Sequence, residues 1–432
     1  MKKLLYILSL VFGVSVVSCD GSDAPLNGYI ETTQQDASTL VLKGYESAAS
    51  GFSVCQPENF NSPFYLKDKS FYGEAYNFLK VGSVRLDEMT SLPGQDAEWV
   101  NTISVESNVS YWVRYASGLT YMFLKMRVVS IEGNNVTIEY VVSDETQERP
   151  NDNVNSNEGI IDNQSVTGYE IPKLNTDTEK YVYADHYVTI NGNSVLNYAL
   201  EWNSDMRHAN WVAFSFDSTT SADVVKRTDA WAVDPKLPVE MQTQEADHKS
   251  DGFDKGHLCA SEDRVYLKEA NEQTFYYSNM SPQLNDLNGG LWAKLEGKVQ
   301  TWGRSTITGT YDKVYVCKGG TMNELLVNFT GTPVSGGTPK TDSKGFTVNG
   351  LACPKYYFMA ILSQKGDDFK AIGFLVEHKE GHPKQPTADQ MKAYAVSIDS
   401  LEKKTGIDFF CNLPDLTEEA VEAEFNLNDW AW

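Results

Sequence analysis

The stretch DGFDKGHLCASEDR, residues 251–264, concentrates chemically active side chains in one short segment of this 432-residue chain. Asp254, Lys255, Gly256 and His257 are consecutive, although the chain holds only six histidines. The glycine lets the backbone approach a ligand closely, Asp254 can orient the loop, and Lys255 adds positive charge beside the imidazole. A histidine is usually structural, but one that is largely neutral at pH 7 can accept a proton from water. These neighbours make His257 a candidate general base.

A second polar cluster follows in TFYYSNMSPQLNDLNGGLWAKLE, residues 274–296. Asn288, Trp292 and Glu296 are spaced four apart, so on a regular helix they share one side, with a rotation of about 40° per step. An amide oxygen and a carboxylate there can hold a hard divalent cation with its water shell. A helix start at Asp286 or Asn288 with a solvated Glu296 explains the same spacing. The spacing alone leaves both interpretations open.

Together, FDKGHL and the second segment resemble the DNA/RNA non-specific endonucleases, which use the ββα-metal (His-Me finger) site. The family pattern is Asp-Arg-Gly-His, then Asn-Met-x-Pro-Gln, then Asn-x-Gly-x-Trp-x-x-Leu-Glu. The resemblance spans roughly residues 170–425. It implies that His257 is the general base, that Asn288 directly binds one Mg²⁺ (with Mn²⁺ as a substitute), and that Glu296 holds a metal-bound water. Arg227 in VKRTDAWAVDP matches a family arginine that neutralises the scissile phosphate, with a surface arginine as the alternative.

Two positions depart from the family pattern. Lys255 stands where the family usually has arginine, so the bidentate fork is lost although the charge is kept. Gln300 stands about where some members carry another arginine. Both changes predict lower activity, or an optimum at lower salt. Neither removes the base or the metal ligand.

The function implied by the resemblance is hydrolysis of DNA and RNA without sequence specificity, with Asp254 included among the catalytic residues. A non-catalytic surface protein that binds nucleic acid or glycans on a nuclease scaffold is one rival. A phosphodiesterase acting on small nucleotides is another. The intact His257, Asn288 and Glu296 favour the nuclease, because a binding scaffold needs no base beside a metal ligand.

The N-terminal half predicts an all-β domain over residues 29–142, arranged as a sandwich. MRVVSIEGNNVTIEYVV, residues 126–142, is two alternating apolar runs around a turn, which is typical of a hairpin. Trp99, Trp112 and Tyr121 suit core packing better than a sugar-binding face, so this domain does not reveal its ligand or surface partner. The acidic, Asn-rich residues 143–168 predict a linker.

Residues 169–432 predict an α+β domain in which helices lie against a largely antiparallel sheet. Residues 286–302 repeat apolar side chains at three- and four-residue spacing, which indicates a helix with one buried face. TADQMKAYAVSIDSLEKKTG, residues 387–406, predicts one helix that begins at a threonine cap and stops at Gly406.

The first residues predict export. Residues 1–18 carry two lysines and then an apolar run, the layout of a signal peptide, and VVSC resembles a lipobox in which Cys19 is lipidated. An ordinary signal peptide is the alternative. Residues 19–28 then form a tether, and the expected location is a membrane surface at the periplasm or cell exterior. The net charge of −23 excludes the broad basic surface of a tight nucleic-acid binder.

The cysteines give one further hypothesis. Export permits disulfides, and five cysteines follow Cys19. Cys259 lies two residues after the candidate base and Cys411 near the C-terminus, so a disulfide between them would tie the C-terminal segment to the active-site loop. Two buried free thiols are the equal alternative.

Overall fold

The computed structural model describes residues 37–46, 53–57, 60, 62–73, 75–150, 152–161 and 166–432. The expected signal peptide, the lipidated Cys19 and the tether lie outside these residues. The chain divides into two compact units, one of residues up to Tyr115 with Met122–Thr146, the other of Ala116–Tyr121 with Gln147–Trp432. Each unit has its own core, and each is described separately below.

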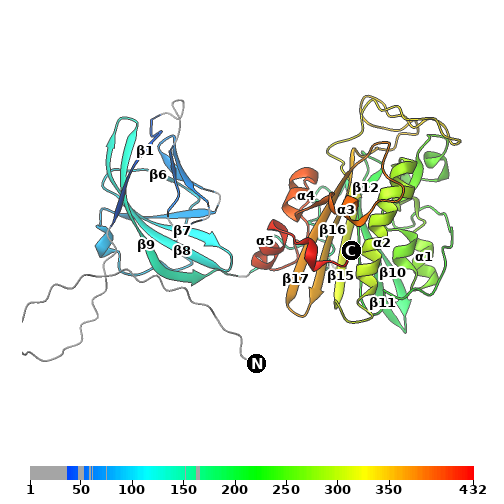
Figure 1. The fold of residues 1–432 in the computed structure, drawn as a ribbon, viewed down its shortest axis with the longest axis horizontal. Coiled ribbons are helices and arrows are strands. Elements are labelled where there is room, and N and C mark those ends of the chain that lie inside the picture. Colours follow the sequence, from blue (N-terminus) through cyan, green and yellow to red (C-terminus); the bar gives the residue numbers. More distant parts are fainter. Residues whose placement is uncertain are drawn as a thin grey trace, which may run out of the picture. The chain divides into compact units, whose positions relative to one another are not determined.

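The first unit is the expected β-sandwich. One sheet has five strands in the order β1 (Ser38–Lys43), β9 (Asn135–Glu148), β8 (Thr120–Glu132), β7 (Ser110–Ser117) and β5 (Tyr76–Gly82). The other has four, β2 (Ser53–Cys55), β3 (Phe64–Lys67), β4 (Ser70–Tyr72) and β6 (Thr102–Ser104). Apolar side chains from both sheets, among them Phe64, Phe71, Phe78 and Val113, form one core (Figure 1).

Trp112 is buried, as the expectation of packing required, but it lies outside the core between the sheets, and Trp99 is only partly buried. Tyr111, Val113 and Tyr115 of β7 point into the sandwich. Successive side chains of a strand point to opposite faces, so Trp112 is on the outer face. There its ring makes an edge contact with Phe123 at 6.3 Å, and Trp99 packs on Phe123 at 6.0 Å.

The second unit is built on a seven-stranded antiparallel sheet. The strand order is β10 (Tyr181–Ile190), β11 (Asn193–Asn203), β12 (His208–Phe216), β15 (Lys313–Gly320), β16 (Tyr356–Lys365), β17 (Asp368–Glu377) and β18 (Ala395–Val396). Its central strands are buried along almost their whole length. This burial explains why their sequences are nearly continuous apolar runs.

Both faces of this sheet are covered, as Figure 1 shows for this unit. One face packs against α2 (Ala293–Arg304) through Leu295, Val299 and Trp302, which confirms the predicted buried helix face. The other face packs against α4 (Ile398–Thr405) and α5 (Asp415–Ala423). The unit is therefore α+β, as expected, with the sheet separating two sets of helices.

The segment expected to be a single helix over residues 387–406 is interrupted. Thr387 caps α3 (Ala388–Lys392) and Gly406 ends α4 with a φ of 72°, so both predicted ends are correct. Between the helices, β18 pairs with the sheet edge at Gly373 and Phe374, and Ser397 starts α4 as a new cap. Strand pairing competes with the helix here. The apolar spacing of the segment carries no information about β17, the strand with which it pairs.

The remaining helices are short. They are α1 (Lys268–Gln273), the π-helix η7 (Leu287–Trp292) and the 3₁₀ turns η2 (Leu86–Glu88), η3 (Val239–Met241), η4 (Glu245–His248), η5 (Ser261–Arg264), η6 (Tyr277–Asn279) and η8 (Leu427–Asp429). Across the described ranges, no helix combines the length and apolar character that a membrane crossing requires.

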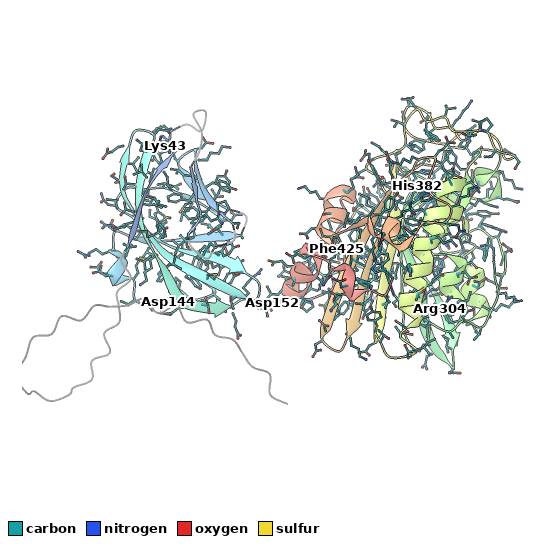
Figure 2. The ribbon with its side chains drawn as sticks, viewed as in Figure 1. Lys43, Asp144, Asp152, Arg304, His382 and Phe425 are labelled. Carbon is teal, nitrogen blue, oxygen red and sulfur yellow. The ribbon has the colours of Figure 1, made fainter. Side chains whose placement is uncertain are left out.

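The described residues of the predicted linker over 143–168 include a strand end and residues with fixed contacts. Asp144 lies on β9, which continues to Glu148 (Figure 2). The Asn157 side-chain amide donates to the Pro172 carbonyl at 2.9 Å, and its backbone N–H donates to Asn412 Oδ1 at 2.9 Å. Val166 joins the core of the second unit. Polar composition suggested a linker, but here asparagine side chains satisfy the backbone of an irregular segment.

Candidate functional site

The two polar motifs form a ββα arrangement. β13 (Asp254–His257) pairs antiparallel with β14 (Met280–Gln283), and the chain then enters η7 and α2. Gly256 lies opposite Ser281, and a Cβ atom on it would come within 2.0 Å of the Gln283 side chain. The glycine is therefore required by close packing. This packing places the candidate base at the end of β13.

His257 is positioned as a neutral imidazole. Its ring is 5.1 Å from Phe275 and 5.7 Å from Trp231, centroid to centroid, and its Nε2 has no hydrogen-bond partner among the described residues. Burial, and then the positive charge of Arg227, lower the pKa of His257 to about 3. The ring therefore carries an unprotonated nitrogen at neutral pH, which is the state a general base needs.

Asp254 lies on the same strand and holds Asn288. Its Oδ2 accepts hydrogen bonds from the side-chain amides of Asn285 and Asn288, each at 3.0 Å. Because the amide nitrogen of Asn288 is used in this contact, its carbonyl oxygen is the atom left for a ligand. Asp254 is therefore a positioning residue for Asn288.

The helical spacing of Asn288, Trp292 and Glu296 is not regular, which corrects the one-sided helix expected from the sequence. Asn288 lies in η7, and Gly290 within it has φ −115° and ψ −113°, values outside any helix. The regular α-helix begins only at Ala293. The double glycine permits this kink, so Asn288 and Glu296 come from differently wound segments.

Glu296 belongs to a buried ionic network. Its side chain is 13% exposed and lies 3.1 Å from the Lys318 ammonium, which also contacts Asp263 at 2.6 Å, and both of these partners are fully buried. Burial raises the pKa of Glu296 to about 7, although Lys318 opposes the rise. Gln300 donates to Asp263 at 3.0 Å, so this departure from the family pattern has a packing role. The solvated alternative for Glu296 is wrong.

Sequence reasoning missed Lys318 and Asp263. The available indication was a lysine inside the otherwise apolar run VYVCKGG of β15, where a buried charge requires a partner.

Two cations lie beside the imidazole, each on an aromatic ring. The Arg227 guanidinium lies over Phe275 at 4.7 Å and pairs with Asp229 at 2.7 Å. The Lys255 ammonium lies 3.8 Å from the centre of the Trp231 ring. Since His257 contacts both rings, the structure brings Arg227 and Lys255 to the same place. The aromatic residues were not predicted, because their motifs are separated along the chain.

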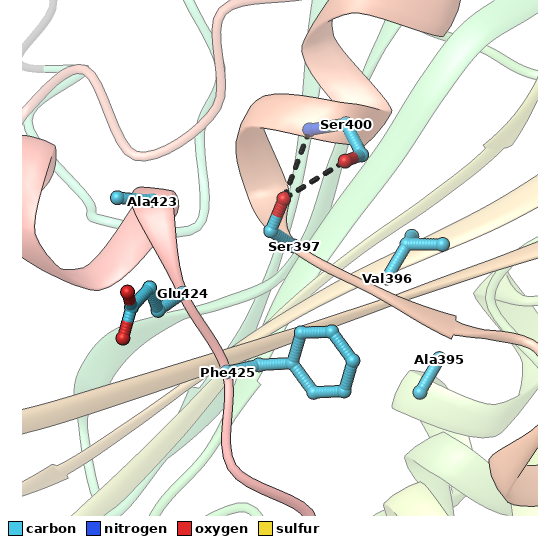
Figure 3. Close-up of a pocket in the computed structure, with 7 residues that line it drawn as sticks. All are labelled: Ala395, Val396, Ser397, Ser400, Ala423, Glu424 and Phe425. Atoms are coloured by element: carbon cyan, nitrogen blue, oxygen red, sulfur yellow. Dashed lines mark hydrogen bonds between the residues drawn. The ribbon is translucent and has the colours of Figure 1, made fainter. Parts of the chain in front are cut away.

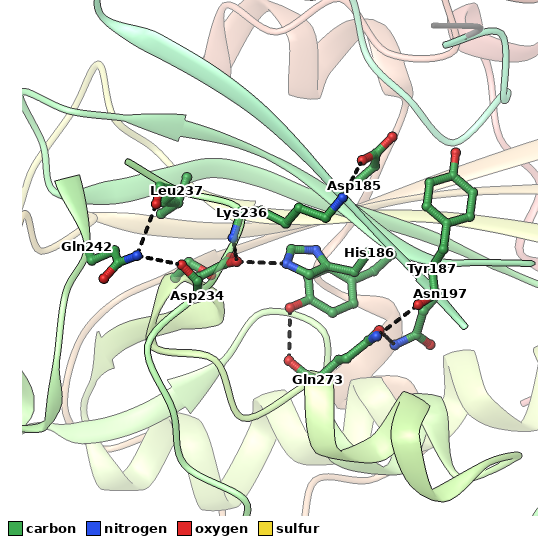
Figure 4. Close-up of polar contacts among 11 residues, drawn as sticks. Asp185, His186, Tyr187, Asn197, Asp234, Lys236, Leu237, Gln242 and Gln273 are labelled. Atoms are coloured by element: carbon green, nitrogen blue, oxygen red, sulfur yellow. Dashed lines mark hydrogen bonds and ion pairs between the residues drawn. The ribbon is translucent and has the colours of Figure 1, made fainter. Parts of the chain in front are cut away.

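A buried network joins His186 to Asp234, three residues after Trp231 in the sequence (Figure 4). The Asp234 carboxylate contacts His186 Nε2 at 3.0 Å and accepts from Ser278 at 2.5 Å and from the Lys236 backbone N–H at 2.9 Å. His186 and Asp234 are almost fully buried. These contacts hold the loop that contains Asp234 against the buried His186, which therefore has a structural role.

The proposed Cys259–Cys411 disulfide is wrong. All cysteines of the described residues are free and buried. Cys259 belongs to the core on the α2 face of the sheet, whereas the Cys411 thiol contacts the Ile171 carbonyl at 3.7 Å beside the core of the opposite face. The sheet separates the two thiols, and the free-thiol alternative is confirmed.

The candidate base is not in the open pocket of about 460 Å³ between the start of α4 and the residues after α5 (Figure 3). That pocket is lined by Ala395, Val396, Ser397, Ser400, Ala423, Glu424 and Phe425, and it contains none of the predicted catalytic residues.

Comparison with known proteins identifies the family by sequence. Residues 179–416 match the family model of the DNA/RNA non-specific endonucleases. Nuclease C1 of Cunninghamella echinulata is 31% identical over 50% of this chain and 81% of its own length. A nuclease of Nostoc sp. is 27% identical over 56% of this chain and 79% of its own, and human mitochondrial endonuclease G is 27% identical over 50% and 68%. A chain of the solved EndoG/EndoGI complex aligns with a TM-score of 0.40 and 22% identity, over 53% of this chain and 87% of that one.

Proposed function

This chain belongs to the DNA/RNA non-specific endonuclease family and is a nuclease, and we propose that it cleaves both DNA and RNA with His257 as the base and Mg²⁺ as cofactor. One observation carries the proposal. A single four-residue strand ends in an imidazole with an unengaged nitrogen and begins with the carboxylate that holds Asn288.

The side chains present fit a hydrated divalent cation. The Asn288 carbonyl oxygen is a hard ligand whose orientation is fixed through Asp254, and Glu296 has a second carboxylate oxygen for a water in the cation's shell. Mg²⁺ keeps most of its waters and needs few protein ligands, and Mn²⁺ would suit the same oxygens. When bound, the ion would stabilise negative charge on the phosphate and on the departing oxygen.

Three side chains of this chain then have separate roles in cleavage. His257 accepts a proton from a water whose oxygen attacks phosphorus, and the P–O3′ bond breaks. The departing O3′ takes a proton from solvent water, so the products are a 5′-phosphate and a 3′-hydroxyl. Arg227 and Lys255 bind the phosphate. Because Arg227 depresses the pKa of His257, a bound phosphate that offsets this charge would bring the imidazole closer to the working pH.

The absence of sequence preference has the same basis. The groups around His257 are cations and rings, which suit phosphates and stacked bases of any identity, and backbone contacts carry no sequence information directly. Lys255 and Arg227 each lie over an aromatic ring, so they form a fixed local site for one phosphate. A strongly acidic chain needs such a local site, because the protein as a whole repels nucleic acid.

Export and anchoring are also part of the proposal. The signal-peptide layout and the lipobox around Cys19 support a lipoprotein on a membrane surface, at the periplasm or cell exterior. The outer face of the N-terminal sandwich, where Arg114 stacks on Trp99 at 4.5 Å, would be the surface for a glycan or another partner.

The test is digestion of plasmid DNA and of RNA by residues 20–432, with Mg²⁺ and with EDTA. We expect metal-dependent cleavage that His257→Ala removes and that added imidazole partly restores. His382→Ala is the matched control, because His382 bonds the Glu377 carbonyl and lies outside the site. Thermal unfolding confirms that each variant is folded. Intact substrates with the wild-type chain would favour the binding-protein alternative, and preference for a dinucleotide over DNA would favour the phosphodiesterase.

A further inference from the structure

Three carboxylates meet between α4 and α5. Asp399 and Glu402 lie on α4, Glu422 lies near the end of α5, and one oxygen of each lies within 4.8 Å of the others. These helices cover the sheet face opposite α2, so the cluster is separate from the nuclease site.

Glu422 is the unusual member of this cluster. It is only 6% exposed, and its buried Oε1 has no hydrogen-bond partner among the described residues. Glu402 by contrast uses one oxygen to accept from the Phe409 backbone N–H at 2.7 Å, and Asp399 is exposed. A buried carboxylate oxygen without a donor is costly unless a proton or a cation satisfies it.

The surroundings increase this cost. Burial, and then acidic neighbours, raise the pKa of Glu422 to about 10, and burial raises that of Glu402 to about 8. The charged groups acting most strongly on Glu422 are Glu402, Glu418, Asp408 and Asp399, all of them acids. Glu422 also lies at the C-terminal end of α5, where the helix dipole disfavours negative charge.

Two donors beside the acidic group, Asn155 and Lys173, bond to other acceptors. Asn155 donates to Asp408 at 3.3 Å and to Glu418 at 2.9 Å, and the Lys173 ammonium donates to the backbone carbonyls of Asn155 and Ser156. None of these contacts reaches Asp399, Glu402 or Glu422, and the buried Oε1 of Glu422 stays without a donor among the described residues.

We propose that Asp399, Glu402 and Glu422 bind a calcium ion that joins α4 to α5. Calcium accepts six to eight oxygen ligands, including flexible carboxylates and waters, whereas Mg²⁺ demands stricter octahedral geometry. The set contains no nitrogen or sulfur ligand, which disfavours zinc. The exposed Asp399 leaves room for water to complete the shell. The site is structural: it stabilises the helical layer behind the sheet and takes no part in cleavage.

The test is thermal unfolding and calorimetric Ca²⁺ titration of residues 20–432 carrying Asn288→Ala, which removes the proposed Mg²⁺ ligand. We expect saturable binding of one Ca²⁺, a rise in Tm of several degrees with Ca²⁺, and a smaller rise with Mg²⁺. Adding Glu422→Gln should weaken Ca²⁺ binding at least tenfold and remove the Ca²⁺-dependent rise. Asp399→Asn, at an exposed position that folding tolerates, should weaken binding in the same direction.

A second readout separates a metal site from ordinary packing. In EDTA at neutral pH, Glu422→Gln should unfold at a higher temperature than its parent, because the neutral amide needs no proton taken up on folding, whereas the carboxyl with its raised pKa does. Glu240→Gln, an exposed carboxylate on η3, is the matched control and should change neither value. Absence of saturable Ca²⁺ binding in the Asn288→Ala chain would overturn the proposal and assign the cluster to protonated acids. An unchanged Ca²⁺ affinity in the Glu422→Gln chain would also overturn it.

Discussion

Replacing Lys318 with methionine tests the buried network behind the site. The ammonium lies 2.6 Å from Asp263 and 3.1 Å from Glu296, and an effective dielectric of about 20 gives gross attractions of about 6 and about 5 kcal/mol. Desolvation of a fully buried lysine offsets much of this attraction. Removing one partner of a buried pair nevertheless costs about 3–5 kcal/mol, because the remaining charges lose their compensation. We expect Lys318→Met to lower the free energy of unfolding by that amount.

The cost should depend on pH. Lys318 opposes the rise in the pKa of Glu296, so its loss moves that pKa above about 7. A carboxyl whose pKa is raised in the folded state contributes its full stabilisation below the unfolded-state pKa. That contribution is lost as the pH rises through the folded-state pKa. The deficit of Lys318→Met relative to wild type should therefore be smaller near pH 5 than near pH 8.

Urea unfolding followed by tryptophan fluorescence measures both quantities. Lys318→Met/Glu296→Gln is the informative control, because neutralising Glu296, the less deeply buried of the two carboxylates, should recover part of the loss. Together with the single variants it forms a double-mutant cycle that isolates the Lys318–Glu296 interaction. A cost below about 1 kcal/mol, or a deficit that does not change with pH, would refute the assignment of Lys318 as the charge that makes burial of Glu296 tolerable.

Three further predictions concern the site and the buried histidines. Asp254→Ala should weaken Mg²⁺ about tenfold in a titration of activity, since Asn288 loses its anchor; unchanged affinity would remove Asp254 from a positioning role. Lys255→Arg should raise kcat/KM several-fold and shift the optimum to higher salt, because guanidinium keeps the stack on Trp231 and adds a bidentate fork; a fall in kcat/KM would contradict this. Burial lowers the pKa of His208 and His378 to about 4, so each opposes folding as pH falls below 6.5, and their NMR resonances should stay in the neutral form to about pH 5; a transition near 6.5 would contradict the burial argument.

The local grouping of the candidate residues could be predicted from the sequence, while their roles in cleavage remain a proposal. Asp254, His257 and Asn288 belong to short motifs whose order along the chain is also their order through β13, β14 and η7. The buried face of α2 followed from the spacing of Leu295, Val299 and Trp302. Such features depend on neighbours a few residues away, which is the range over which periodicity and motifs carry information.

The parts that depend on distant neighbours were missed. Asp263 and Lys318 are 55 residues apart and meet only because η5 and β15 lie together in the folded unit. Cys259 and Cys411 were paired on their positions near the site, but their separation by the sheet is a property of the topology. The outward direction of Trp112 likewise follows from which face of β7 the sandwich covers.

The burial of the thiols gives the chain a practical property. Cys55, Cys259, Cys317, Cys353 and Cys411 are all enclosed, and burial raises each thiol pKa, so little reactive thiolate forms at neutral pH. In a chain beginning at Asp20, the native cysteines therefore need not be replaced before maleimide labelling. Cysteines introduced at the exposed Val41 and Val348 would take a pair of dyes without removing any native residue of the cores. Energy transfer between the dyes would then follow the two units in solution as nucleic acid arrives.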